Sequence, residues 1–341
     1  LHDHPYFDVK VIAASERSAG KSYYDAVKGK WKLSQGIPDN IGPMVVKDLH
    51  NIEEISKEVD FVFCAVDMPA NEIREIEENY AKSETPVVSN NSAHRLTPDV
   101  PIIIPEVNPE HLYIIEKQRK RLGTSRGFIV TKPNCSIQSY VPAINALMDF
   151  RPSMLSVCTY QAISGSGKTF ADWPEMIDNV IPFIPGEEEK SEQEPLKVLG
   201  HINGDEIVKA YEPVITAQCI RVSAAEGHLA AVSVSFKHRP SMETIIDCWK
   251  NYKGKPQLLK LPTAPKQFLT YFSENNRPQT RLDREAENGM GITLGRLRED
   301  NIFDYKFVCL SHNTLRGAAG GSVLTAELLA SEGYLEAKCD A

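Results

Sequence analysis

The stretch 59-VDFVFCAV-66 decides the fold class, together with 71-NEIREIEENYA-81 and 86-PVVSN-90 after it. A continuous apolar run of this length is typical of a buried strand, and the charged segment that follows has the composition of a surface helix. Further strand-like runs lie at 9-VKVIAA-14 and 127-GFIVTK-132. Strands that alternate with helices predict a mostly parallel sheet with helical crossovers.

The middle of the chain has a different pattern. Long β-rich segments predict a second domain that is built on a broad mixed or antiparallel sheet. The chain then returns to a helical pattern at 316–334, and the segment 182–195, rich in Pro, Gly and Glu, is predicted to be a loop that leads into a helix. The β-rich segments are 154–165, 211–223, 228–236, 292–300 and 303–310.

Composition narrows the class of protein. The 341 residues suggest two domains, and 42% hydrophobic with 25% charged residues is ordinary for a globular chain. A net charge of -8 argues against nucleic acid or an anionic membrane as a partner. Seven scattered cysteines without a CxxC pair favour a reducing compartment, which predicts a cytoplasmic protein, and no Cys/His spacing suggests a metal site. No apolar run reaches about 18 residues, and no signal peptide is evident.

The stretch 162-AISGSGKT-169 resembles a phosphate-binding P-loop, which would indicate a nucleotide hydrolase. The motif requires glycine five residues before Gly167, and Ala162 stands there instead. Pro174 also falls within the first turns of the helix that the motif needs. We therefore interpret the stretch as a Gly-rich turn after a strand, where the backbone passes close to a ligand or makes a tight turn.

A candidate nucleophile lies in 131-TKPNCSIQSYVPAINAL-147. Apolar residues at helical spacing follow Cys135, so we expect it at a helix N-terminus, with a kink at Pro142. The helix dipole would lower the pKa of the thiol and favour the nucleophilic thiolate. His228, seven residues after Arg221, is a candidate base. The alternatives are a structural histidine and a cysteine that is only a small buried hydrophobe, which is our interpretation of Cys64, Cys158, Cys219, Cys248 and Cys309.

Several motifs in one order resemble the aspartate-semialdehyde dehydrogenase family, in its archaeal and fungal branch. They are 89-SNNSAHR-95 with 105-PEVNPEHL-112, 133-PNCS-136, 160-YQAISGSG-167, 187-EEEK-190 and 221-RVSAAEGH-228. The resemblance implies an α/β protein with a Rossmann-type dinucleotide-binding domain and an α+β catalytic and dimerisation domain with a mixed sheet. It assigns residues 1–133 with 316–341 to the first domain and residues 134–315 to the second.

The same resemblance implies roles for individual residues. Cys135 would be the nucleophile, His228 the general acid/base, and Gln161 the residue that orients the acyl intermediate. Arg221 would bind the substrate carboxylate and Glu187 its ammonium group. Lys190, with Arg95 and Asn134, would bind phosphate. Without the resemblance, Glu187 and Lys190 are more simply explained as a surface ion pair at i and i+3.

The cofactor implied is NADP. Ser15, Arg17 and Ser18 follow the strand-like run 9–14 and suit a 2′-phosphate, although Glu16 is an acidic neighbour. Ser164, Gly165, Gly167 and Asn313 would contact the rest of the cofactor, at its nicotinamide end. The family's Gly-x-x-Gly-x-x-Gly turn is not found in the sequence, so we expect the first strand and its turn to be missing and NADP to bind weakly.

The reaction implied is the reversible conversion of L-aspartate 4-semialdehyde and phosphate to 4-aspartyl phosphate through a cysteine thioester, in lysine, methionine and threonine biosynthesis. We expect a homodimer or homotetramer. Alternatives are a malonyl-CoA reductase, the reductase for acetylated glutamyl phosphate or another acyl-phosphate or acyl-thioester reductase of the superfamily. A nucleotide hydrolase that uses 162–169 and an inactive structural isoform also remain possible interpretations.

Overall fold

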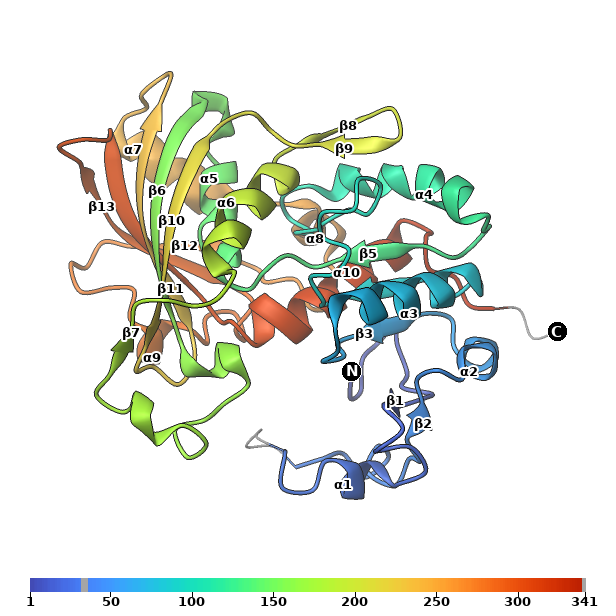
Figure 1. Cartoon of the computed structure of the whole chain (residues 1–341). Helices are drawn as coiled ribbons and strands as arrows, with labels where there is room; N and C mark the ends of the chain where they lie inside the picture. The colour runs from blue at the N-terminus through green and yellow to red at the C-terminus, as the bar shows by residue number, and fades with distance from the viewer. Residues whose placement is uncertain (32–35, 339–341) are drawn as a thin grey trace.

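A seven-stranded mixed sheet forms one side of the molecule (Figure 1). The computed structural model describes residues 1–31 and 36–338. The strand order is β12-β13-β14-β11-β6-β10-β7, which confirms the mixed sheet predicted for the second domain. Its strands are β6 (Pro152–Gln161), β7 (Val180–Ile181), β10 (Val214–Val222), β11 (His228–Phe236), β12 (Leu269–Phe272), β13 (Ile292–Glu299) and β14 (Tyr305–Ser311).

Alternation along the strands separates two faces of this sheet. In β6, Leu155 and Val157 are buried, whereas Met154 and Tyr160 are exposed. The inner face packs against α5, α6 and α7, around a core that includes Trp249. Each such buried apolar side chain contributes roughly 1.5–3 kcal/mol through the area removed from water. The covering helices are α5 (Val141–Asn145), α6 (Glu187–Val198) and α7 (Met242–Asn251).

A smaller parallel sheet, of three strands, forms the other side. The strands predicted within 59–66, 86–90 and 127–132 are confirmed as β3 (Val62–Cys64), β4 (Val87–Ser89) and β5 (Ile129–Thr131). The predicted helix at 71–81 is α3 (Ala70–Lys82), and α4 (Ile115–Leu122) ends at Gly123, which adopts a left-handed conformation. These elements confirm the parallel α/β architecture expected of this half.

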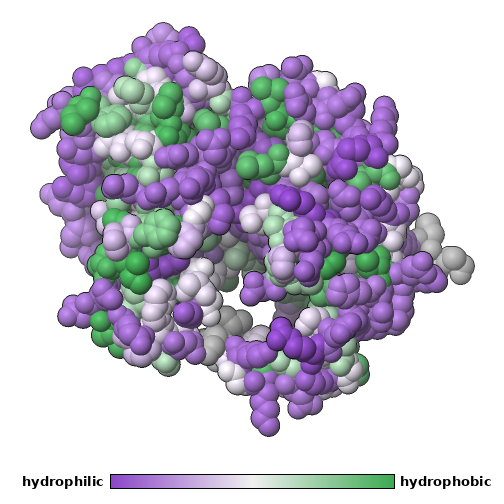
Figure 2. Space-filling model, viewed as in Figure 1, coloured by the Kyte–Doolittle hydropathy of each residue, from purple (hydrophilic) through white to green (hydrophobic). Residues whose placement is uncertain are grey.

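The strand predicted at 9–14 shrinks to β1 (Ala13–Ala14), which pairs only with β2 (Lys47–Asp48). A cavity of about 360 Å³ lies between this two-stranded sheet and β3, with Val11, Phe61 and Val62 among its lining residues. Among the described residues, the parallel strands of this half of the molecule therefore form two sheets rather than one. Figure 2 shows the segment around α1 and β2 standing apart from the large sheet across a gap.

The chain passes from the large sheet to the small one through its last helix. After β14, a π-helical turn (η6, Leu315–Ala319) leads into α10 (Gly320–Ser331), which contacts β4. The buried Arg316 in η6 makes a two-pronged ion pair with Glu106, which fixes this connection. Within residues 1–31 and 36–338, no helix has the length and apolar character needed to cross a bilayer.

The remaining elements are short. They are α1 (Tyr23–Ala26), α2 (Ile52–Glu58), η1 (Pro109–Ile114), η2 (Ser136–Gln138), η3 (Met148–Phe150), η4 (Ile163–Ser166), η5 (Pro174–Met176), β8 (His201–Asn203), β9 (Glu206–Val208), α8 (Lys255–Leu259) and α9 (Thr280–Asp283).

Candidate active site

Three predicted site residues meet at one end of the seven-stranded sheet. Gln161 is the last residue of β6, and Arg221 lies opposite it on the parallel neighbour β10. β11 is antiparallel to β6, so its first residue, His228, lies at the same end. All three are at most 6% exposed. Sheet pairing therefore brings together residues that are as far as 67 positions apart in sequence.

Cys135 lies in the segment that leaves β5, but not at the start of a long helix. The turn after it, η2, has three residues, and the α-helical segment α5 begins only at Val141. Pro142 occupies the first turn of α5, so it starts a helix rather than kinking one. The five apolar residues predicted to share a face are all buried, namely Ile137, Tyr140, Val141, Ile144 and Leu147.

The expectation of a lowered thiol pKa is wrong for this structure. Burial raises the pKa of Cys135, and the charge of Glu187 raises it further, whereas Lys132, Arg95 and Arg221 lower it. A three-residue turn supplies little dipole to offset the desolvation. The surroundings are nevertheless ionic, unlike those of Cys309, whose burial raises its pKa to about 12.

Glu187 joins the thiol segment to the sheet. Its carboxylate accepts hydrogen bonds from Asn134 (2.9 Å), from Gln161 (3.1 Å) and from Lys190 (3.1 Å). Glu187 starts α6, so the helical i, i+3 relation to Lys190 is confirmed. Burial raises the pKa of Glu187, but Lys190 and the hydrogen bonds outweigh it, and the net shift is downward. The group is therefore a carboxylate at neutral pH.

A second carboxylate on the same helix was not found from sequence. Glu194 accepts from the backbone N–H of Asn134 (2.6 Å) and from Arg95 (2.9 Å). Arg95 donates further to the carbonyls of Lys132 and Asn90. Its guanidinium is thus bonded to protein on all three nitrogens, which suits positioning of the loop better than direct contact with phosphate. The spacing of Glu187 and Glu194, i and i+7 on one helical face, was the available signal.

His228 has a defined tautomer. Its Nδ1 accepts the backbone N–H of Ala162 (3.1 Å), so the neutral ring carries its proton on Nε2. Nε2 is buried and has no hydrogen-bond partner among the described residues. Burial, with the charge of Arg221, lowers the pKa of His228 to about 3. A buried, unpaired N–H of this kind is available for a ligand oxygen.

Gly165 lies directly against this ring. A Cβ built on Gly165 would stand 3.0 Å from Nε2 of His228 and 2.8 Å from the guanidinium of Arg221. The backbone at Gly165 therefore packs too closely against these side chains for any residue with a Cβ. Arg221 itself donates to the carbonyl of Ala162 at 2.7 Å, which ties the β10 end to the same turn.

The turn 162–169 is not a P-loop. It forms the 3-10 turn η4 and ends at Gly167, whose φ of 71° favours glycine. Lys168 lies over the ring of Trp173, 4.5 Å from its centroid. Ser164 instead accepts from Asn313 (2.9 Å), whose side-chain oxygen accepts from the N–H of Gly227 (2.8 Å). The structure thus brings Ser164 and Asn313, two predicted cofactor residues, into contact.

The other predicted cofactor residues lie in the turn after β1. The N–H of Ser18 donates to the carbonyl of Ser15 (2.9 Å), which closes the turn. Arg17 is exposed at its tip, next to the exposed Glu16. Among the described residues, no hydrogen bond joins this turn to the large sheet.

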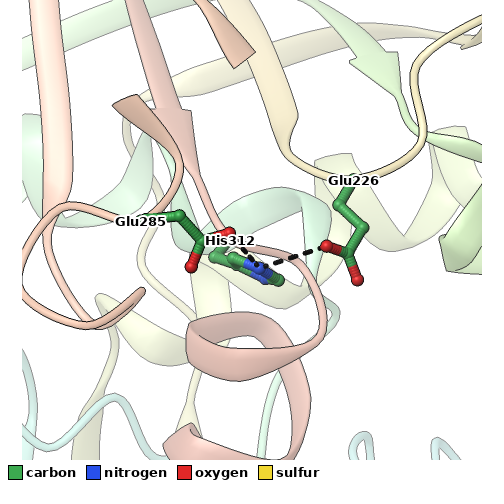
Figure 3. A group of neighbouring side chains, drawn as sticks. All are labelled: Glu226, Glu285 and His312. Atoms are coloured by element: carbon green, nitrogen blue, oxygen red, sulfur yellow. Dashed lines mark ion pairs between the residues drawn. The ribbon is translucent and has the colours of Figure 1, made fainter. Parts of the chain in front are cut away.

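His312, Glu226 and Glu285 form a cluster whose composition could hold a metal ion (Figure 3). The Nε2 of His312 lies 3.6 Å from Glu226 and 3.4 Å from Glu285. Its Nδ1, however, accepts the backbone N–H groups of Thr314 and Leu315, so Nε2 carries the proton. That bonding leaves no lone pair on Nε2 for a metal, and the ring points an N–H toward the two carboxylates.

Comparisons with known proteins agree with this arrangement. Residues 1–115 match the family model "Semialdehyde dehydrogenase, NAD binding domain", and residues 144–316 match "Semialdehyde dehydrogenase, dimerisation domain". The chain is 43% identical to an aspartate-semialdehyde dehydrogenase of Archaeoglobus fulgidus, over 97% of this chain and 93% of the relative. The chain belongs to the semialdehyde dehydrogenase family.

Further similarities extend over the same length. An aspartate-semialdehyde dehydrogenase of Schizosaccharomyces pombe is 42% identical over 98% of this chain and 94% of its own. A crystal structure of the Candida albicans enzyme with NADP superposes with a TM-score of 0.85 at 36% identity, covering 97% of this chain and 93% of that one. The predicted family and fold class are confirmed. The residue roles and the boundaries 1–133 with 316–341 and 134–315 stay predictions.

Proposed function

We propose that this semialdehyde dehydrogenase catalyses the NADP-dependent, reversible conversion of L-aspartate 4-semialdehyde and phosphate to 4-aspartyl phosphate. The observation that carries the proposal is the single network in which Glu187 bonds both Asn134, next to Cys135, and Gln161 at the sheet end. The choice of substrate is supported by two relatives that are named aspartate-semialdehyde dehydrogenase, one from an archaeon and one from a fungus. They are 42–43% identical over nearly the whole chain.

The covalent steps occur on Cys135. Its sulfur attacks the aldehyde carbon, and the resulting oxyanion collapses to a thioester as the substrate loses a hydride. Phosphate oxygen then attacks the thioester carbon, and the sulfur leaves as thiolate. The chemistry that bound NADP would supply is that of the hydride acceptor, and of the hydride donor in the biosynthetic direction. The exchange of the thiol proton is assigned to His228.

The tautomer of His228 gives it the acid role in the state described. Its Nε2–H can donate to the oxygen that becomes negative when sulfur attacks. In the opposite role, as base for the thiol, the ring must take up a proton at an unprotonated nitrogen, which requires release of the Ala162 bond at Nδ1. Gln161, a neighbour of Glu187, is the second group proposed to orient the acyl intermediate.

The charges of the site suit a zwitterionic substrate with an anionic partner. Arg221 would bind the α-carboxylate through its planar guanidinium. Glu187, held as a carboxylate, would bind the ammonium group, and Lys190 would receive the phosphate. Arg95 and Asn134 would hold the loop that faces the phosphate, because their described bonds link it to Glu194 and Glu187.

The residues present fit NADP at two places. Gly165 packs directly against His228 and Arg221, and the nicotinamide end would lie beside this turn, next to Gly167 and the Ser164–Asn313 pair. Arg17, Ser15 and Ser18 would hold the 2′-phosphate at the exposed turn after β1. The same turn would be the site at which NADP is preferred to NAD.

Assembly through the large sheet is part of the proposal. Its outer face exposes Met154, Tyr160 and Val214 to solvent by 50%, 36% and 63%. The match to a dimerisation domain supports a homodimer through this face, and a tetramer is its extension.

Six free cysteines among the described residues support the cytoplasm as the location of the protein. The acidic net charge gives no basis for a nucleic-acid or membrane partner.

The test is phosphate-dependent reduction of NADP with L-aspartate 4-semialdehyde, for the parent chain and for Cys135→Ser. We expect activity in the parent and a loss of at least about a thousandfold in the variant, because a serine hydroxyl is a far weaker nucleophile than a thiolate. Cys248→Ser, at a half-buried thiol on α7, is the matched control and should keep full activity. Turnover of malonyl-CoA with NADPH, without turnover of the semialdehyde, would contradict the proposal.

A further inference from the structure

Lys132 is a buried lysine directly after β5, and none of the sequence motifs gave it a role. Its side chain is 3% exposed. The ammonium group donates to two backbone carbonyls, those of Pro133 and Gly317. Its described acceptors are neutral carbonyls, so no bonded carboxylate offsets the positive charge of the ammonium group.

Both carbonyl groups border the nucleophile. Pro133 precedes it in the chain by two residues. Gly317 lies against it, because a Cβ built on Gly317 would stand 2.7 Å from the Cβ of Cys135. Gly317 belongs to the π-helical turn η6, in which its N–H bonds to the carbonyl of His312, five residues back. Such widened turns leave carbonyls free of the regular helical ladder and occur often at functional sites.

We propose that Lys132 is a positioning residue for Cys135: its ammonium group ties the two backbone segments on either side of the thiol and supplies the positive charge that favours the thiolate. This inference rests on the proposed role of Cys135 as nucleophile. The stabilisation of the thiolate that was expected from a helix dipole would thus come from a buried lysine.

The other charges around Lys132 are already paired. Arg95 is bonded to Glu194, and Arg316 is bonded to Glu106. Cys135 is the remaining ionisable group among those that act on Lys132. Burial, with the charge of Arg95, lowers the pKa of Lys132 to about 7, while Cys135 and Glu194 raise it. The charge is therefore present below about pH 7 and is lost as the pH rises above it, unless the thiolate retains it.

Lys197 provides an internal comparison. It is equally buried, at 2% exposure, and donates to the carbonyls of Arg95, Thr97 and Val100. Burial lowers its pKa to about 7 as well, but Cys135 is not among the groups that act on it. The two lysines thus share burial and backbone acceptors and differ in whether the thiol is a neighbour.

The experiment measures the rate of Cys135 alkylation by iodoacetamide from pH 6 to 9.5, read by mass spectrometry of the peptide that contains it. It needs neither substrate nor cofactor, so it can fail while the aldehyde assay succeeds, and the reverse. Lys132→Gln keeps two N–H donors but removes the charge, and Lys132→Arg keeps the charge at every pH of the range. Lys197→Gln is the control, and thermal unfolding of each variant reports folding.

We expect alkylation at pH 7 to be roughly tenfold slower in Lys132→Gln, because an opposite charge nearby shifts a pKa by about one unit or more. At pH 8.5, Lys132→Arg should react several-fold faster than the parent, whose lysine has lost charge. Lys197→Gln should lower the unfolding temperature without moving the alkylation profile. The proposal would be overturned if the Lys132 variants had the same pH profile of alkylation as the parent, or if Lys197→Gln shifted that profile equally. If Lys132→Gln does not fold, the arginine variant alone decides.

Discussion

The two ends of the proposed site are built in different ways. At the end of the large sheet, Gln161, Arg221 and His228 are at most 6% exposed and bonded to protein. At the turn after β1, Arg17 is exposed, and the turn is closed by the backbone bond from Ser18 to Ser15 and by the ammonium group of Lys21, which donates to the carbonyl of Arg17. The side chains of the first region are held in place before a ligand arrives, whereas the exposed side chain of Arg17 would lose conformational entropy when it binds one. Changes in the buried region should therefore cost more.

The sharpest test of that difference is Arg221→Lys. A lysine keeps the charge but loses the planar fork and the bond to the carbonyl of Ala162. We expect kcat/KM for the semialdehyde to fall by about 100- to 1000-fold, the range for disrupting a buried charge contact. The KM for NADP should stay within about twofold. An equal loss in Arg17→Lys would show that the two regions do not differ.

A smaller loss is expected from Gly165→Ala. The added methyl group would lie 2.8–3.0 Å from Arg221 and His228, so one of them must move. A displacement of this size costs roughly 10- to 100-fold in kcat. Gly204→Ala in the turn between β8 and β9 is the control, since a Cβ there meets nothing within 4 Å but the φ of 62° is strained. That control should lose stability and keep kcat, and a loss of kcat there would contradict the steric explanation.

The exposed region should give a loss of about tenfold, confined to the cofactor. Arg17→Ala removes one charge-assisted hydrogen bond to the 2′-phosphate. We expect the KM for NADP to rise about tenfold and that for NAD to change little, measured by initial rates at saturating semialdehyde. Lys28→Ala, an exposed lysine farther along the same segment, is the matched control. An equal rise in the KM for NADP and for NAD would show that this turn does not bind the 2′-phosphate.

The smallest effect concerns stability at acid pH. The folded pKa of His228 is about 3, below its unfolded value near 6.5, so the unfolded chain binds the extra proton between these values. Its contribution to stability is complete above about pH 6.5 and falls as the pH is lowered. Between pH 7 and 5.5, the parent should lose about 1 kcal/mol more free energy of unfolding than His228→Gln, measured by urea titration. Parallel losses would contradict the burial of a neutral ring.

Sequence predicted what depends on local pattern and failed where tertiary bonding decides. The strands β3 to β5, β10 and β11, and the helices α3 and α10, follow from apolar runs and periodicity. The motifs supplied candidate site residues. They did not predict that Cys135 lacks a long helix after it, because Pro142 can either kink a helix or start one. Glu194 and Lys132 were missed because each acts through backbone groups that are 60 and 185 positions away.

The ion pair between Glu187 and Lys190 has a consequence for the order in which the substrates bind. The carboxylate has two oxygens and already accepts from Asn134, Gln161 and Lys190. Of these donors, Lys190 is the most open to water, with 36% of its side chain exposed. In the proposed roles, the substrate amine would displace Lys190 from Glu187, and the released ammonium group would then be free to bind phosphate. The substrates would thus bind in order, the amino acid first and phosphate second. The two binding events would be coupled because Lys190 leaves Glu187 in the first and binds the anion in the second.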